Sequence, residues 1–257
     1  MLARFYFSNE DYFEAKNWAM MVINSTKYSL VPDVNALFQN LNNENNETIF
    51  SVTRSANNLG NINEDLLPTS LGGSGHYRVP VSLLENFNPL DRRLEVFLKE
   101  DEDEYYVVKF WDEFNEPAGG LTSVDFPIIR FADILLMYAE CENEINGGPT
   151  TDAYTAINLV RGRARQAVVN DILEVRDILP DLKELNFAQF QEAVRQERKL
   201  EFLWEGLRWT DLVKNGELIN AISEVKPTAD PTIRNYYFPI PSIEMELHPN
   251  WSQNPGY

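Results

Sequence analysis

Acidic and basic side chains alternate with large apolar residues in the stretch 195–216, RQERKLEFLWEGLRWTDLVKNG. Carboxylates serve in general acid and base catalysis, and carboxylates with perturbed pKa values gather at active sites. The structural alternative is that these acids face arginines in satisfied ion pairs, where the loss of one buried partner costs about 3–5 kcal/mol. We favour the structural interpretation, and we do not assign Glu205 as a general acid.

The spacing of apolar residues in this stretch predicts a single helix. A broad apolar face is formed by Phe190, Val194, Leu200, Leu203, Trp204 and Leu207. Several charges lie on or beside that face and therefore need partners. The predicted charge network consists of Arg130, Asp133, Glu140, Arg161, Arg163, Glu197, Arg198, Glu201, Glu205, Arg208 and Asp211. We interpret this network as a device of the fold that ties the helix to helices earlier in the chain.

A polar, glycine-rich stretch carries the first candidates for ligand contact. Residues 54–78 show no clear period, which is typical of a long surface loop, and long irregular loops are often functional. His76 and Tyr77 in this loop could hydrogen-bond to a ligand or stack on it, and Asn58 is a weaker candidate of the same kind. The structural alternative for these residues is a plain surface turn.

A strand rich in aromatic and β-branched residues is predicted at 105–111. It follows the acidic run 99–104, which we expect at a solvated hairpin tip, because the run lacks the glycine and the alternating spacing of a calcium loop. Trp111 is a further candidate for ligand contact, with Phe114 close behind it in the sequence. Core packing is the alternative for both rings.

Other catalytic and cofactor sites lack the residues that they need. Two histidines and one cysteine are a poor ligand set for zinc or iron. The chain has no Gly-x-Ser-x-Gly elbow of a serine hydrolase, and the GGSG at 72–75 is not followed by the Lys-Ser/Thr of a phosphate loop. A glycosidase needs only two well-placed carboxylates, so that class stays open, although forty acidic residues produce such pairs by chance. We predict no enzyme activity, no metal site and no cofactor.

The composition predicts a well-packed protein that does not bind nucleic acid by charge. The chain has 257 residues, of which 44% are hydrophobic, enough for one large domain or two coupled lobes. Forty acidic against 22 basic side chains give a formal charge of -18, which disfavours nucleic acid and anionic lipid as partners. Cys141 is the one cysteine, so no internal disulfide is possible. The first residues do not resemble a secretory leader, and no apolar stretch reaches the ~18 residues of a membrane-spanning helix.

Three further helices are predicted from capping residues and apolar periodicity. Residues 8–11 have the pattern of a capping box that opens a helix ending near Asn24. A second helix covers 130–144 and stops at the Asn-Gly-Gly-Pro of 146–149. A third covers 152–167, and the apolar residues of the second and third helices are spaced to pack as an antiparallel pair.

Three blocks of the sequence, in this order, resemble the C-terminal half of the SusD/RagB family. The blocks are RFADILLMYAE (130–140) followed by AINLVRGRA (156–164), ERKLEFLWEGLRWTDL (197–212), and YFPIPSIE (237–244) followed by QNPGY (253–257). The resemblance extends over 1–257. It implies a mainly α fold, with a SusD-like, tetratricopeptide-like helical scaffold, irregular loops and a short β-hairpin. Because family members are usually much longer, it also implies that an N-terminal half, with signal peptide and lipid anchor, is absent.

The resemblance also implies a function. Family members are surface lipoproteins that capture nutrients, so we expect a non-enzymatic binding protein at the outer membrane, on the cell surface. We expect it to capture glycan and to deliver it to a SusC-like TonB-dependent transporter. Aromatic side chains suit sugars because apolar sugar faces stack on the rings while the hydroxyl groups take polar partners. The alternatives are a RagB-like peptide-binding lipoprotein and a helical docking scaffold that binds only protein partners.

Overall fold

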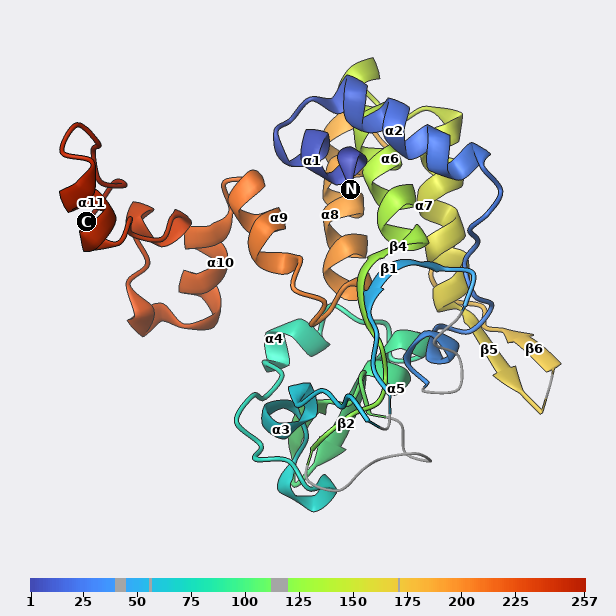
Figure 1. The fold of residues 1–257 in the computed structure, drawn as a ribbon. Helices are drawn as coiled ribbons and strands as arrows, with labels where there is room; N and C mark the ends of the chain where they lie inside the picture. Colours follow the sequence, from blue (N-terminus) through green and yellow to red (C-terminus); the bar gives the residue numbers. More distant parts are fainter. Residues whose placement is uncertain (40–44, 56, 112–119, 171) are drawn as a thin grey trace. The chain divides into compact units, whose positions relative to one another are not determined.

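The computed structural model describes residues 1–39, 45–55, 57–111, 120–170 and 172–257. The chain forms two compact units, Met1–Glu205 and Gly206–Tyr257. Helices dominate both units, and within the described residues the strands form three two-stranded antiparallel sheets (Figure 1). The predicted mainly α fold is confirmed, although the sequence predicts one hairpin and three strand pairs are present. None of the helices described in either unit combines the length and the apolar character that crossing a bilayer requires.

The helical part of the first unit is centred on α6. Its helices are α1 Leu2–Ser8, α2 Tyr12–Asn24, α6 Phe131–Asn146, α7 Thr151–Ala164 and α8 Phe187–Glu201. Helix α6 packs against each of the other four (Figure 1). Every residue of α6 from Phe131 to Asn143 is buried, as expected for a helix with neighbours on all sides. The predicted helix pair is present as α6 and α7.

Capping residues fix the ends of these helices. Asp11 caps α2 by accepting a hydrogen bond of 3.2 Å from a backbone N–H of its first turn. The predicted end of α2 at Asn24 is correct, but the predicted capping box is wrong in its first residue, because Ser8 ends α1 instead. Gly147 ends α6 in the left-handed conformation, with a φ of 65°, and Thr150 caps α7.

The rest of the first unit is irregular and carries the strands. Its short helices are η1 Val34–Phe38, α3 Ile62–Leu66, η3 Thr69–Leu71, α4 Val81–Leu84 and α5 Arg92–Phe97. Its strand pairs are β1 Thr48–Val52 with β4 Phe126–Arg130, β2 Leu98–Asp101 with β3 Glu104–Val107, and β5 Gln166–Val169 with β6 Ile172–Val175. A hydrophobic core holds this part together, with Phe97 and Phe110 each edge-on to Phe38 at ring-centroid distances of 5.7 Å.

The acidic run forms the tip of the β2–β3 hairpin, as predicted. Asp101 pairs with Glu104, so Glu102 and Asp103 make a two-residue turn. Both turn residues have positive φ, 50° and 65°, which matches the turn to the twist of the strands. The centre of the run, Glu102 and Asp103, is therefore a solvated turn.

Two predicted boundaries are wrong. The strand predicted over 105–111 ends at Val107. The helix predicted to continue to 167 ends at Ala164, because the β5–β6 hairpin starts at Gln166. This hairpin is rich in valine and isoleucine, whose branched side chains favour strands over helices.

The predicted single helix over 195–216 is also wrong, because the chain leaves the helix after Glu201. Helix α8 ends there, Trp204 and Gly206 adopt positive φ of 61° and 79°, and the next helix begins at Arg208. The apolar period continues through the break, so periodicity alone does not reveal it.

Two buried cations stabilise the end of α8. The last carbonyl groups of a helix lack partners within the helix. Lys109 Nζ donates to the carbonyl oxygens of Glu201 and Leu203, at 3.1 Å each. Arg130 Nη2 donates to the carbonyl oxygen of Glu201 at 2.8 Å. Positive charge at this end also complements the helix dipole.

The second unit consists of short helices and a closing segment. Its helices are α9 Arg208–Lys214, α10 Leu218–Val225, η4 Pro227–Ala229, η5 Ile233–Tyr236 and α11 Ser242–Leu247. Gln253 exchanges two hydrogen bonds of 2.8 Å with the backbone of Ile240, and Asn254 Nδ2 donates to the carbonyl oxygen of Phe238 at 2.7 Å. The terminal QNPGY block therefore binds the YFPIP block.

Candidate functional site

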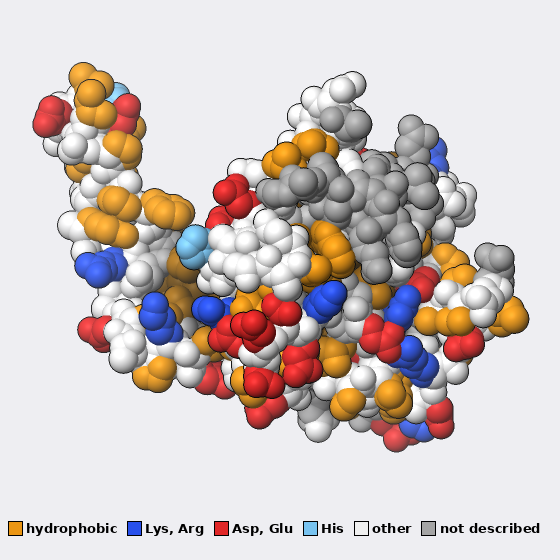
Figure 2. Space-filling view, turned by 90° about the horizontal axis from the view of Figure 1, so that it is seen from below, with side chains coloured by type: hydrophobic (Ala, Val, Ile, Leu, Met, Phe, Trp, Pro, Cys, Tyr) orange, Lys and Arg blue, Asp and Glu red, His pale blue; other side chains and the backbone are white. Residues whose placement is uncertain are grey.

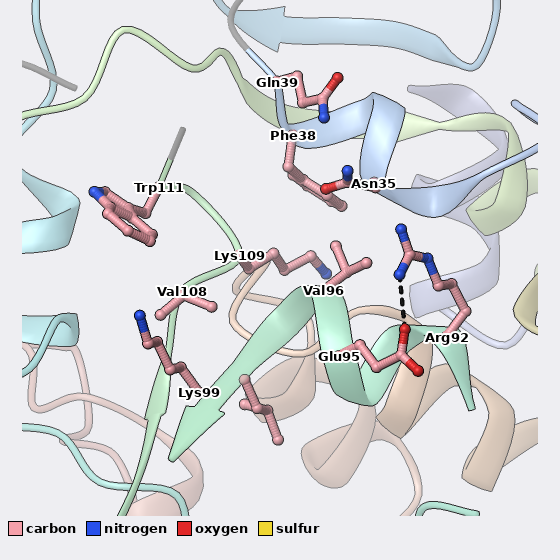
Figure 3. A pocket seen from close by; sticks show the side chains of 11 residues that line it. Asn35, Phe38, Gln39, Arg92, Glu95, Val96, Lys99, Val108, Lys109 and Trp111 are labelled. Carbon is pink, nitrogen blue, oxygen red and sulfur yellow. Dashed lines mark hydrogen bonds and ion pairs between the residues drawn. The ribbon is translucent and has the colours of Figure 1, made fainter. Parts of the chain in front are cut away.

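A pocket of about 370 Å³ lies in the irregular part of the first unit (Figure 3). It is bounded by η1, α5, β2 and the segment that follows β3. Small-molecule sites are usually clefts of about 300–1,000 Å³. The lining residues are Asn35, Phe38, Gln39, Arg92, Glu95, Val96, Leu98, Lys99, Val108, Lys109 and Trp111. Aromatic, amide and charged side chains therefore surround one hollow.

Trp111 and Lys99 form one wall of the pocket (Figure 3). Lys99 lies on β2 and Trp111 follows β3, so the hairpin brings the two side chains together. Lys99 Nζ lies 5.4 Å from the centroid of the indole ring, within cation–π distance. Trp111 is half-buried here, and its contact with a ligand stays a prediction. Phe114 lies outside the described residues.

Arg92 and Glu95 form a second, charged wall (Figure 3). Arg92 donates from Nε and Nη2 to Asp33, at 3.2 Å each, and from Nη1 to Glu95 at 2.7 Å. Arg176 Nη1 lies 2.6 Å from Glu95 Oε1. Burial alone would raise the pKa of Glu95, but hydrogen bonds from Arg176 and Arg92 lower it. This carboxylate is therefore ionised and doubly paired.

Lys109 connects the pocket to the protein interior. Its side chain is fully buried, with Nζ 3.8 Å from the ring centroid of Phe97 and 4.7 Å from that of Phe38. Nζ also lies 2.5 Å from Glu205 Oε1. Burial lowers the pKa of Lys109 to about 8, although the attraction of Glu205 opposes the shift.

Arg130 is the centre of a buried charge network. Its guanidinium lies 2.5 Å from Glu201, 2.8 Å from Glu205 and 2.9 Å from Glu47. Arg163 pairs with the same Glu201 and lies 2.8 Å from Glu47. All five side chains are at most 3% exposed. Each charge in this set therefore faces at least one opposite charge.

Arg93 extends the network to the other side of Glu201. It lies 2.7 Å from Asp91, 2.5 Å from Glu197 and 3.2 Å from Glu201. Arg161, whose side chain is 15% exposed, adds a pair of 3.1 Å with Glu197. The network thus joins α5, α7 and α8.

The structure brings most of the predicted network residues together. Arg130 pairs with Glu205, Arg161 with Glu197, and Arg198 with Asp133 at 2.9 Å. The same aspartate also lies 2.6 Å from Arg4. Glu140 is buried on α6. Arg208 and Asp211 belong to the second unit, where they lie on α9.

Five members of the network are absent from the prediction: Arg4, Arg93, Asp91, Glu47 and Lys109. Their partners lie far away in the sequence, as in the pair of Arg163 and Glu47, which are 116 positions apart. The local periodicity of the sequence does not indicate contacts between residues so far apart.

The network holds its carboxylates in the ionised form. Burial would raise the pKa of Glu201, but Arg163, Arg130 and Arg93 lower it well below the usual value. Arg198 and Arg4 likewise lower the pKa of Asp133 against the effect of burial. An acid catalyst needs a raised pKa to keep its proton near neutral pH. These two carboxylates therefore serve as structural anions.

The described residues also contain no group of three or more His, Cys, Asp or Glu side chains arranged to hold a metal ion.

An exposed aromatic pair forms a second candidate surface. The rings of Tyr77 and Trp204 lie 5.3 Å apart at an interplanar angle of 53°. Tyr77 is 50% exposed and Trp204 is 37% exposed. A φ of 61° at a tryptophan is a sparsely populated conformation, and such strain clusters at functional sites. The sequence assigns Trp204 to an apolar helix face, so its pairing with Tyr77 is not predicted.

His76 stands beside this pair in a hydrogen-bonded loop. Its Nδ1 lies 2.8 Å from Ser74 Oγ and 3.1 Å from Asp65 Oδ1. The backbone N–H of Tyr77 donates to the carbonyl oxygen of Asp65 at 3.1 Å, and that of Ser74 donates to Glu64 at 2.7 Å. The loop is therefore anchored on α3, and it presents the aromatic ring from a fixed backbone.

The glycines of the GGSG segment serve close packing. A Cβ on Gly73 would lie 2.2 Å from the carbonyl oxygen of Leu67. Gly72 and Gly75 have positive φ of 85° and 64°, which glycine adopts without strain. This local requirement accounts for the glycines without a phosphate site.

The contacts of Asn58 are local. Its side-chain amide donates to the carbonyl oxygen of Thr53 at 3.2 Å, and its backbone pairs with Ser55. Among the described residues, Tyr77 contacts Trp204 and Lys99 contacts Trp111, whereas the side chain of Asn58 bonds to the backbone of Thr53.

Comparison with known proteins gives consistent matches. The SusD family model matches residues 95–257. SusD-like protein P25 of Formosa agariphila is 30% identical over 179 residues, which are 67% of this chain and 30% of that protein. A SusD superfamily crystal structure from Parabacteroides distasonis has a TM-score of 0.81 at 23% identity, over 100% of this chain and 61% of its own. Surface glycan-binding protein A from Bacteroides uniformis has a TM-score of 0.76 at 21% identity, over 98% and 59%.

These matches differ in what they establish. The solved structures share the fold at low identity, and the chain spans 61% of the length of the first of them and 30% of the length of the curated relative. The family match rests on sequence and covers well over half of the chain, including all of α6 to α11. The chain belongs to the SusD family.

Proposed function

We propose that this protein captures glycan at the bacterial cell surface without chemical turnover. The exposed pair of Tyr77 and Trp204 carries the proposal, because an aromatic face offers the apolar contact that sugar C–H groups need. His76 stands beside it as a polar partner for hydroxyl groups. A relative in fold, from Bacteroides uniformis, is named a surface glycan-binding protein, which supports this ligand class.

The absence of turnover is part of the proposal. Glu201 and Asp133 are buried, paired with arginines and held ionised, so they have no proton to donate to a glycosidic oxygen. The pocket carboxylate Glu95 is likewise ionised between two arginines. A glycosidase would need one raised and one ordinary carboxylate facing the same sugar.

The partner and the location follow the family resemblance. We propose that the protein lies at the outer membrane and delivers the glycan to a SusC-like TonB-dependent transporter. The formal charge of -18 argues against nucleic acid as a ligand.

The test is calorimetric titration of the protein with panels of oligosaccharides and peptides. We expect saturable binding of one sugar class, weakened about tenfold, or 1.4 kcal/mol, by Tyr77→Ala or Trp204→Ala. Phe13→Ala is the matched control, because this ring is 63% exposed on α2, outside both candidate surfaces. Chromatography of the bound sugar after incubation should recover it intact.

Three other results would overturn the proposal. Sugar binding with product release would indicate a glycosidase. Binding of peptides alone would favour the RagB-like alternative. Binding of neither, with a protein partner still retained, would favour a docking scaffold.

A further inference from the structure

We infer that the pocket lined by Trp111 and Lys99 accepts an acidic sugar residue, one that carries a carboxylate or a sulfate group. The inference rests on the proposed function, since it takes the ligand to be a glycan. It adds a chemical class and a second site, separate from the Tyr77–Trp204 pair.

The described lining of the pocket is richer in basic than in acidic side chains, whereas the whole chain is acidic. The chain carries 40 acidic and 22 basic side chains, and acidic groups gather on the face that Figure 2 presents. Among the described lining residues, Arg92, Lys99 and Lys109 are basic and one, Glu95, is acidic. Glu95 already faces two arginines. Arg92 also pairs with Asp33, and the buried Lys109 pairs with Glu205. Among the described residues, the lining cation with no paired carboxylate is therefore Lys99, which favours an anion.

Lys99 is the group placed to bind that anion. Lys99 lies on β2 and lines the pocket. The neighbouring Glu100 points to the opposite face of the strand and accepts a hydrogen bond of 2.9 Å from Tyr105. Within the described part of the chain, Lys99 Nζ contacts the Trp111 ring and no carboxylate. An ammonium group that pairs with no described carboxylate at the rim of a pocket can pair with a ligand carboxylate or sulfate.

The remaining lining suits the rest of a sugar ring. Asn35 and Gln39 present side-chain amides toward the hollow (Figure 3). Neither amide makes a hydrogen bond to another described residue, so both are available to hydroxyl groups. Trp111 supplies an apolar surface beside them. Arg92 is held in place by Asp33 and Glu95, which balance its charge.

The test compares charged sugars with matched neutral ones by calorimetry at physiological salt. One arm uses oligogalacturonate against its methyl ester, and the other uses a sulfated galactan oligosaccharide against its desulfated form. We expect one acidic ligand to bind about five- to tenfold more tightly than its neutral partner. Lys99→Gln should remove that difference, and Lys99→Arg should retain it. Lys27→Gln is the control, since it removes the same charge at an exposed position outside the pocket.

The outcomes separate this inference from the proposed function. Equal binding of acidic and neutral sugars in both arms would overturn the inference and leave glycan capture standing. A preference for acidic sugars that survives Lys99→Gln would place the anion elsewhere and would also overturn it. Failure to bind any sugar would overturn the proposed function itself. Trp111→Ala should weaken acidic ligands while Tyr77→Ala leaves the charge preference unchanged.

Discussion

Lys109 Nζ lies 2.5 Å from Glu205 Oε1, and the two side chains are 0% and 3% exposed. The same residue lines the pocket, and its ammonium group binds the carbonyl oxygens at the end of α8. The pocket wall, the helix end and the charge network are therefore one connected structure. A change at any of these positions is expected to reach the others through Lys109.

The first prediction concerns stability in mild alkali. The folded pKa of Lys109 is lowered to about 8 from an ordinary value of 10.5, so between these values the unfolded chain binds more protons than the folded one. The free energy of unfolding should therefore gain a contribution that rises with pH, by at most about 1.4 kcal/mol per pH unit. Urea unfolding of the wild type and of Lys109→Met from pH 7.5 to 10 checks this. Parallel pH curves for the two proteins would contradict the prediction.

The second prediction compares how much two arginines of the network contribute to the free energy of unfolding. Arg93 is fully buried and faces three carboxylates, so Arg93→Ala should lower the free energy of unfolding by about 3–5 kcal/mol. Arg161 is partly exposed, and its partner Glu197 keeps Arg93 at 2.5 Å. Arg161→Ala should therefore cost only about 1 kcal/mol.

Melting temperature checks this order, and the ligand affinity of Arg161→Ala should stay at the wild-type value. Unchanged stability in Arg161→Ala would show that its ion pair does not support the fold.

The third prediction tests the glycine-rich loop. Gly73→Ala would place a Cβ 2.2 Å from a backbone carbonyl oxygen, so the loop that carries His76 and Tyr77 must shift. We expect a loss of about 1–3 kcal/mol and weaker sugar binding. Gly148→Ala is the matched control, because no atom lies within 4 Å of its Cβ and its φ is not positive. Equal melting temperatures for the two variants would remove the packing argument.

Local pattern accounts for the parts of the fold that the sequence predicts. Helices α6 and α7 follow from apolar periodicity and from the glycine that ends α6. At the break after Glu201, Lys109 binds a freed carbonyl oxygen through a hydrogen bond that spans 92 positions, so the sequence around α8 does not contain this partner. Long-range partners stabilise this boundary.

The candidate site likewise combines residues that the sequence predicts with residues that it does not. His76 and Tyr77 are predicted because they lie in a polar loop, which composition reveals. Trp204 lies at a position that fits an apolar helix face, so the sequence does not indicate its positive φ or its contact with Tyr77. The pocket at Trp111 is assembled from η1, α5 and the β2–β3 hairpin, and only the folded chain brings these together.

The last prediction separates strain from contact at Trp204. Its φ of 61° is costly for any residue with a Cβ but not for glycine. Both Trp204→Ala and Trp204→Gly remove the ring beside Tyr77, so both should lose the same sugar affinity. Trp204→Gly should nevertheless be more stable than Trp204→Ala, by about 0.5–1 kcal/mol, because it also relieves the backbone. Urea unfolding of the two variants measures that difference, and an alanine variant as stable as the glycine variant would show that this backbone is unstrained. If the difference is found, the protein holds an unfavourable conformation that turns an aromatic ring toward solvent, as a binding surface requires.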